Sequence, residues 1–359
     1  MKSNYKLGEL IKQRREKYDG TDLPICGVTK DGFIPPKQKD ADTSLYNMFY
    51  LKDFVFNPAR MELNSIVFND KYEKAMCSSL YEVFYVERTD IIMPEYLALI
   101  VKQDRFVRFC EFQGSGSARE YCRVANISEL PIEVPTLDEQ LRIVNHYSVI
   151  NKRITLIRHI NENLAETAQT IFKHTFIEPT QDGFPSTWTK VPLFQVADLG
   201  AGGDRPDVFS NIKTPECSIP IFSNGIESEG LYGYTDKAKV YSESVTISAR
   251  GTVGYVFLRQ EPFVPIVRLI YITPKNNQVT AKYLYFALRY AEMNSTGTSQ
   301  QQITVPDFKN TPITVPDENT MILFMRQIEP LFDEVNRNKD EIVSLQSLQT
   351  VILQTISSR

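Results

Sequence analysis

The most reactive side chains in this sequence are its cysteines, and their spacing argues against chemistry at them. There are five, an odd number, and no two form a C-x-x-C pair: Cys26, Cys77, Cys110, Cys122 and Cys217. Such spacing predicts neither a disulfide framework nor a zinc site. We expect free and mostly buried thiols, and no bound metal.

The histidines are also poor candidates for catalysis. His146, His159 and His174 fall in one segment with helical periodicity, where we expect them to be solvated or to face a partner. The sequence lacks a G-x-x-x-x-G-K-[ST] phosphate loop, and it lacks the Asn-Pro-Pro-aromatic or Asp-Pro-Pro-aromatic element with which amino-methyltransferases hold a flipped base. These absences argue against an enzyme.

Polar side chains on short loops rich in glycine and proline form a different kind of candidate site. The loops read KDGFIPPKQK, FNPARM and GSGSAREY in the first half of the chain, and GAGGDRPD, FSNGIESEG, ISARGTVG and TSQQQ in the second. For GSGS, a plain flexible turn is the alternative. The candidate binding residues are Lys37, Lys39, Asn57, Arg60, Arg119, Tyr121, Arg205, Asn224, Arg250, Gln300 and Gln301.

Length and composition limit the architecture that carries these loops. The chain has 359 residues, of which 42% are apolar, and suits two domains with connecting helices. It has no apolar run of transmembrane length and no signal peptide, so we expect a soluble, cytoplasmic protein. The net charge of -4 argues against a binder that depends on counterion release alone, although partners could supply part of the neutralisation.

The sequence contains an internal repeat. Gly116 aligns with Gly297, and the ungapped alignment then matches Val124, Pro131, Ile132, Val134 and Pro135 with Val305, Pro312, Ile313, Val315 and Pro316. Upstream, with a drifting offset, Tyr96-Leu97 matches Tyr283-Leu284. Each copy ends in P-x-x-V-P, whose prolines favour extended backbone and stop the preceding element. Thr136, Asp138 and Asp317 are the expected N-caps of the helices that follow.

Both following segments carry heptad ladders that predict long helices. Connectivity requires two such helices to pack antiparallel, as a rod of roughly 50 Å at ~1.5 Å per residue. We predict that Asn161 faces Asn338, since each amide would satisfy the other. Two amphipathic helices, each lying on its own domain, are the alternative. The predicted seam residues are Ile143, Ile150, Ile157, Asn161, Leu164, Ile171, Leu331, Val335, Asn338, Ile342 and Leu345.

These features resemble a known family, the specificity subunits of type I restriction-modification enzymes. The resemblance covers essentially the whole chain, through KLGELIKQRREK, FNPARMELNSI, GSGSAREYCRV, LPIEVPTLDEQLRIV, GYTDKAKVY, TISARGTVGYVF and GTSQQQITVPDF. One departure is DENTM at 317–321, where the first copy has the E-Q-x-x-I pattern. The implied fold class is α+β, with target recognition domains at 1–136 and 179–316 and spacer helices at 137–178 and 317–359.

The resemblance also implies a function. Each domain would read one half of a split duplex DNA sequence, with Arg or Lys suited to guanine and Asn or Gln to adenine. Arg119 and Gln300 would share one aligned position. The helices would dock two modification subunits, which are methyltransferases that use S-adenosylmethionine, and restriction or translocase subunits would complete the enzyme. This chain would bind no cofactor and no membrane, and would perform no chemistry itself.

Some alternatives remain open at the level of sequence. The chain could be a self-contained modifying enzyme, or a two-headed scaffold that binds proteins or other ligands without DNA specificity. The basic run from Lys12 to Lys17, expected on a first helix, could contact phosphate or form a solvated face. The bases recognised are not readable from composition, because loop geometry determines them.

Overall fold

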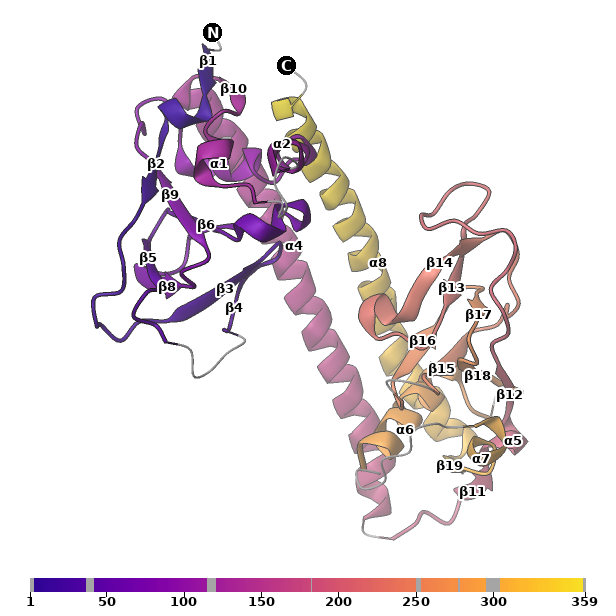
Figure 1. Cartoon of the computed structure of the whole chain (residues 1–359). Helices are drawn as coiled ribbons and strands as arrows, with labels where there is room; N and C mark the ends of the chain where they lie inside the picture. Colours follow the sequence, from indigo (N-terminus) through magenta and orange to yellow (C-terminus); the bar gives the residue numbers. More distant parts are fainter. Residues whose placement is uncertain are drawn as a thin grey trace. The chain divides into compact units, whose positions relative to one another are not determined.

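The computed structural model describes residues 3–36, 42–114, 121–181, 183–249, 253–276, 278–294 and 304–357. The chain forms two compact units. The first comprises Met1–His159 and Asn338–Arg359, and the second Ile160–Arg337. Figure 1 labels the elements of both.

The described residues of the first unit form three sheets. Strands β1 (Ser3–Lys6) and β10 (Pro131–Val134) pair antiparallel. The four-stranded sheets have the orders β2-β9-β6-β7 and β4-β3-β8-β5. Their strands are β2 (Ile11–Arg14), β3 (Ile25–Thr29), β4 (Gly32–Ile34), β5 (Asn47–Tyr50), β6 (Phe54–Phe56), β7 (Ile66–Phe68), β8 (Lys74–Cys77) and β9 (Glu82–Val86). The helices are η1 (Leu7–Glu9), η2 (Pro58–Leu63), α1 (Pro94–Ile100), α2 (Asp104–Gly114) and α3 (Val124–Ile127).

The sheet that contains β6 is buried on both faces. Successive strand residues point to opposite faces. Phe54 and Phe56 accordingly join the core that includes α1 and α2, whereas Val55 joins a second core formed with the sheet of β3 and β8. This burial on both sides explains the continuous apolar run FVF.

The second unit repeats this plan. Strands β11 (Thr189–Pro192) and β19 (Pro312–Val315) pair antiparallel. The other sheets have the orders β12-β18-β15-β16 and β14-β13-β17. Their strands are β12 (Ala197–Ala201), β13 (Ile219–Phe222), β14 (Leu231–Thr235), β15 (Ser244–Ile247), β16 (Val256–Arg259), β17 (Val264–Pro265) and β18 (Ile270–Pro274). The helices are α5 (Leu193–Val196), η5 (Glu227–Gly230), α6 (Ala281–Asn294) and α7 (Val305–Phe308).

The two units share most of their strand topology, as the predicted repeat requires, although β5 has no counterpart among the described strands of the second unit. The order β2-β9-β6-β7 corresponds strand for strand to β12-β18-β15-β16. In each unit one parallel pair occurs at the same place, β3 with β8 and β13 with β17. The aligned tyrosines Tyr96 and Tyr283 are both buried, at 2% and 1% exposure.

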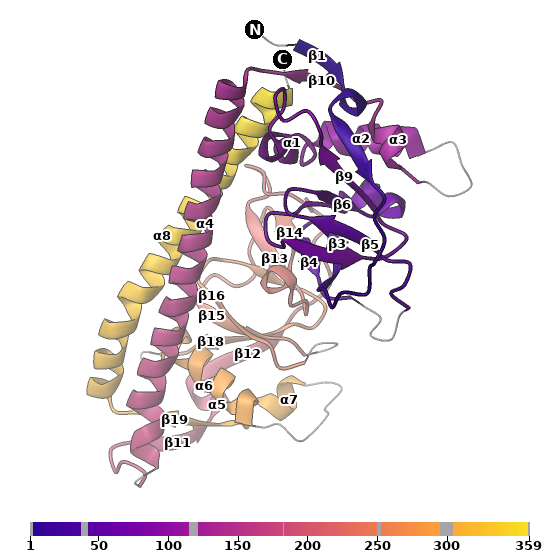
Figure 2. The same ribbon diagram turned by 90° about the vertical axis from the view of Figure 1, so that its left-hand side faces the viewer.

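Two long helices complete the fold: α4 (Leu137–Phe172) and α8 (Glu318–Ser357), which runs through Pro330 (Figure 2). A π-helical turn, Lys173–Ile177, and a 3-10 turn, Glu178–Thr180, extend α4. In the first unit, Arg153 of α4 makes two hydrogen bonds to Glu341 of α8, at 2.7 and 3.2 Å. In the second unit, the rings of Phe172 and Phe324 lie 6.2 Å apart. The start of each helix therefore packs with the end of the other, and the two run antiparallel as predicted.

Burial along the helices follows the predicted seam. Ile157 and Asn338 are buried, at 1% and 6% exposure, and the other nine predicted seam residues are half-buried. Apolar residues outside the seam, such as Val149 and Val343, are more than half exposed. The individual Asn161–Asn338 pairing stays a prediction.

The first helix is joined to its domain by a buried amide. Gln140 is fully buried, and its side-chain oxygen accepts from the backbone nitrogen of Met93 at 2.8 Å. Its nitrogen donates to the carbonyls of Ile91 and Pro135, both at 2.8 Å. Thr136 Oγ1 accepts from the backbone nitrogen of Glu139 at 3.4 Å, as expected of an N-cap, whereas Asp138 lies inside the first turn.

The second helix is joined differently. Met321, which aligns with Gln140, is buried in the apolar core at 4% exposure. The polar contacts move to Asp317, whose carboxylate accepts from the backbone nitrogen of Thr320 at 3.0 Å and from the indole nitrogen of Trp188 at 3.1 Å. The DENTM departure thus replaces a hydrogen-bonded glutamine by an apolar side chain, while the N-cap residue Asp317 gains a bond to Trp188.

The remaining expectations for the fold concern thiols, metals and membranes. All five cysteines are free and buried, as predicted, and burial raises the pKa of the Cys77 thiol, which disfavours the reactive thiolate. The described residues contain no cluster of His, Cys, Asp and Glu that could hold a metal ion. Among the described helices, none combines the length and the apolar character that crossing a bilayer requires.

Candidate nucleic-acid interface

The structure locates five of the eleven predicted contact residues. These are Asn57, Arg60, Tyr121, Arg205 and Asn224. The other six, Lys37, Lys39, Arg119, Arg250, Gln300 and Gln301, lie outside the described residues.

In the first domain, three described candidate residues lie on or beside the helical turn η2. Asn57 caps η2, and its side-chain oxygen accepts from the backbone nitrogen of Ala59 at 3.1 Å. Arg60 lies exposed on the same turn. The backbone nitrogen of Cys122 donates to the carbonyl of Pro58 at 3.0 Å, which places half-buried Tyr121 beside η2. The side-chain oxygen of Asn57 is therefore used to cap η2, whereas Arg60 is exposed to solvent.

The basic run from Lys12 to Lys17 is not on a helix. The expectation of a first helix was wrong: residues Ile11–Arg14 form β2, which pairs with β9. Pairing with the sheet decides the conformation here, because tertiary contacts override local propensity. Lys12 binds Glu87 at 2.8 Å, and Lys17 donates to Asn47 at 2.6 Å.

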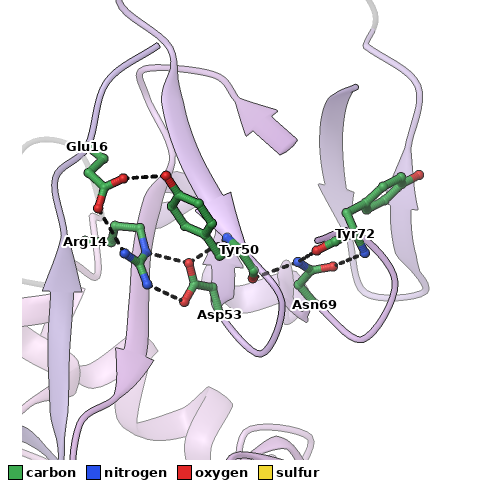
Figure 3. Close-up of polar contacts among 6 residues, drawn as sticks. All are labelled: Arg14, Glu16, Tyr50, Asp53, Asn69 and Tyr72. Carbon is green, nitrogen blue, oxygen red and sulfur yellow. Dashed lines mark hydrogen bonds and ion pairs between the residues drawn. The ribbon is translucent and has the colours of Figure 1, made fainter. Parts of the chain in front are cut away.

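Arg14 from this run belongs to a structural network, which Figure 3 shows. It contacts both carboxylate oxygens of Asp53, at 2.6 and 3.1 Å, and lies over the rings of Tyr50 and Tyr85. Burial raises the pKa of Asp53, against the opposing effect of the hydrogen bonds from Arg14. Nearby, Asn69 donates to the carbonyls of Tyr50 and Tyr72, both at 2.7 Å (Figure 3). These contacts hold the turn between β5 and β6 and the turn between β7 and β8.

In the second domain, three predicted loops converge on one corner, residues 266–269 between β17 and β18. From GAGGDRPD, the carbonyls of Gly203 and Gly202 accept from the backbone nitrogens of Val267 and Arg268, at 2.9 and 3.1 Å. From FSNGIESEG, the Asn224 side chain donates to the Val267 carbonyl at 2.7 Å. From ISARGTVG, the backbone nitrogen of Ala249 donates to Asn224 Oδ1 at 2.8 Å. Both ends of the Asn224 amide thus hold the loops to one another.

The backbone of this corner is strained. Val267 and Arg268 have φ values of 51° and 62°, in the left-handed region. Such conformations cost on the order of 1–3 kcal/mol for residues other than glycine and persist only where surrounding contacts impose them. A Cβ on Gly202 would lie 2.6 Å from the backbone nitrogen of Ile266, so the close approach requires glycine there.

The corner lies among exposed cations. Arg268 and Lys239 are exposed, and Lys239 Nζ is 4.0 Å from the place that a Cβ would take on Gly203. Arg205, two residues beyond Gly203, holds its guanidinium 4.7 Å from the centre of the Phe209 ring. Sequence reasoning missed Arg268. The available signal was a single charge within the apolar run VPIVRLIYI.

Comparisons with known proteins agree on one family. The family model described as "Type I restriction modification DNA specificity domain" matches twice, over residues 3–166 and 185–342. A crystal structure of the type I restriction-modification system S subunit from M. genitalium is similar in fold, with a TM-score of 0.62 and 15% identity over 99% of this chain and 96% of that one.

Curated relatives carry related names. The putative type I specificity subunit S.MpnORF507P of Mycoplasma pneumoniae is 25% identical over 210 residues, which are 57% of this chain and 56% of that protein. Another from that organism, S.MpnORF89P, is 34% identical over 131 residues, which are 36% of this chain and 39% of that protein. The type I restriction enzyme MjaIX specificity subunit of Methanocaldococcus jannaschii is 21% identical over 297 residues, which cover 74% of this chain and 68% of that protein. The first two matches span about half or less of those relatives. With both halves of the chain matched by the family model, this protein belongs to the type I restriction-modification DNA specificity family.

Proposed function

We propose that this chain is the subunit that selects the DNA sequence for a type I restriction-modification enzyme. Each recognition domain reads one half of a bipartite duplex site, and the chain itself catalyses no reaction. The observation that carries the proposal is the double family match on two units that share a four-stranded sheet of the same strand order and differ in their loops. A shared frame with different loops suits the reading of two different half-sequences.

We propose further that α4 and α8 act as spacer and docking element. A pair of antiparallel helices packed along an apolar seam is stiff, so it can set the separation of two half-sites. The partners would be two methyltransferase subunits, which bring S-adenosylmethionine, and restriction or translocase subunits. Part of the phosphate neutralisation would come from these partners, which suits the net charge of -4. Since the target is duplex DNA, we place the complex in the cytoplasm.

The decisive experiment compares DNA methylation in the source cell with and without this gene. We expect a split motif of methylated adenines that disappears on deletion and returns on complementation. A complemented strain with no gene-dependent motif would contradict the proposal. Failure of the chain, assembled with its partner subunits, to protect any duplex DNA would instead favour a scaffold for proteins or other ligands, and methyl transfer by the chain alone would favour an enzyme.

A further inference from the structure

The corner at residues 266–269 holds one exposed arginine in a fixed position. The backbone nitrogen of Arg268 is bound to Gly202, and that of Gly202 is bound in turn to the carbonyl of Leu269, at 2.8 Å. The neighbouring Val267 is held on both sides, by Gly203 through its nitrogen and by Asn224 through its carbonyl. The Cα of Arg268 is therefore fixed while its side chain extends into solvent.

The side chain of Arg268 differs from those of the three arginines that bind carboxylates within the fold. Arg14, Arg153 and Arg259 each bind a carboxylate, from Asp53, Glu341 and Glu229. Within the part of the chain that the structure describes, no ion pair or side-chain hydrogen bond involves Arg268. The strained backbone thus supports a guanidinium that contributes no described contact to the fold.

The first domain has an equivalent corner with a different residue. Ile11 pairs with Val86 in β2 and β9, and Ala197 pairs with Pro274 in β12 and β18. Val86 in β9 is therefore equivalent to Pro274 in β18. Leu80 and Arg268 each lie six residues before these positions, so they are aligned. Leu80 is 78% exposed, the same as Phe112 and above every other exposed large apolar residue recorded for the described chain. Both domains therefore expose a large side chain at one shared place, and the two side chains differ in chemistry.

We propose that Arg268 reads a guanine in the half-site recognised by the second domain, and that the strained corner positions it for this contact. The inference rests on the proposed function and assigns one residue of its specificity. Arginine donates two parallel hydrogen bonds to O6 and N7 of guanine in the major groove. A bidentate contact of this kind depends on accurate placement, which a backbone locked by neighbouring loops provides. A phosphate contact would make no such demand.

The test uses the chain assembled with its methyltransferase subunits, because the complex is the active form under the proposal. Wild type, Arg268→Ala and Arg268→Lys are each given a DNA library in which every position of both half-sites varies, and methylated molecules are sequenced. We expect Arg268→Ala to lose about 5- to 100-fold of the preference for guanine at one position of one half-site. Arg268→Lys should lose a smaller part of it, because an ammonium lacks the planar pair of donors. The other half-site and the spacer should be unchanged.

A matched control is Lys309→Ala, which removes an exposed cation of the same domain at the end of α7. It should leave both half-sites as in wild type. Thermal melting of each variant checks folding, and Arg268→Lys keeps the test valid if the alanine variant melts early. Uniform weakening across all sequences, with a shallower salt dependence, would identify a phosphate contact and overturn the inference. So would an unchanged motif. A wild-type complex without any split motif would overturn the proposed function as well.

Discussion

The side-chain oxygen of Gln140 accepts a 2.8 Å hydrogen bond from the backbone nitrogen of Met93, so that one amide ties the first turn of α4 to the start of α1. The same amide satisfies two carbonyls of the domain. Buried polar groups that lose their partners cost about 1–3 kcal/mol each. This residue therefore stabilises the junction between helix and domain.

We expect Gln140→Ala to lower the free energy of unfolding of the first unit by about 1–3 kcal/mol, because one buried and two partly buried backbone groups lose a partner. Urea denaturation followed by circular dichroism measures the change. The control is Arg142→Ala, an exposed position on the same turn, which should change stability by less than about 0.5 kcal/mol. If Gln140→Ala lowered the free energy of unfolding no more than Arg142→Ala does, the amide would contribute nothing to stability.

Asp317 should make the stability of the second unit depend on pH. Its hydrogen bond from the Thr320 backbone nitrogen, with further bonds from the side chains of Thr320, Trp188 and Thr187, holds its pKa below the usual value. A carboxylate with a lowered pKa stabilises the fold above its unfolded pKa, about 3.9, and loses this contribution as the pH falls through the folded value.

Asp317→Ala should therefore lower stability by about 1 kcal/mol at pH 7, the typical cost of losing an N-cap. The difference from wild type should shrink below about pH 4, in thermal melts recorded across the acid range. Asp317→Asn keeps an acceptor without the charge, so it should retain part of the stability and show less pH dependence. A difference that stays constant into strong acid would rule out the carboxylate as the cause.

The apolar seam, and not the ion pair, should hold the two helices together in the first unit. Arg153 and Glu341 are 52% and 38% exposed, and exposed pairs contribute about 0–1 kcal/mol. Ile157 is 1% exposed, and replacing a buried isoleucine by alanine costs about 2–5 kcal/mol. In denaturant melts, Ile157→Ala should therefore be much more destabilising than Arg153→Ala. The reverse order would mean that charge pairing dominates.

Two substitutions in the strained corner, Val267→Gly and Gly202→Ala, should have opposite effects on the melting temperature. Val267→Gly removes the left-handed strain of a β-branched residue, which offsets the added flexibility of the unfolded chain, so the melting temperature should hold or rise. Val149→Gly, at an exposed helical position, should lower it. Gly202→Ala should lower it too, because the new Cβ would meet the backbone of Ile266. A drop for Val267→Gly as large as that for Val149→Gly would show that the corner is not strained.

The long-range architecture was predictable because it rests on periodic signals. Heptads running from Ile143 and Phe324 predict two helices, and the P-x-x-V-P repeats predict where each helix joins its domain. Local signals were weaker where tertiary contacts decide. The segment Ile11–Arg14 reads as a continuing helix, yet pairing with β9 makes it a strand.

The contact surface was only partly predictable, for a physical reason. Loop composition indicates which side chains are available, but not which are consumed by the fold. Asn57 and Asn224 both use their amides to hold backbone in place. A left-handed backbone conformation is usually indicated by glycine or asparagine in the sequence. At Arg268 neither residue is present, because hydrogen bonds from residues distant in the sequence impose the conformation.

The first compact unit includes Asn338–Arg359 as well as Met1–His159, and Ile356 packs against its main apolar core. During synthesis on the ribosome, most of this unit emerges early, yet its last helical segment is translated only after the whole second unit. Domains generally fold in the order in which they are made. Here the first unit cannot be completed until the last residues of the chain have been made. A truncated or stalled product would therefore leave part of its apolar core exposed.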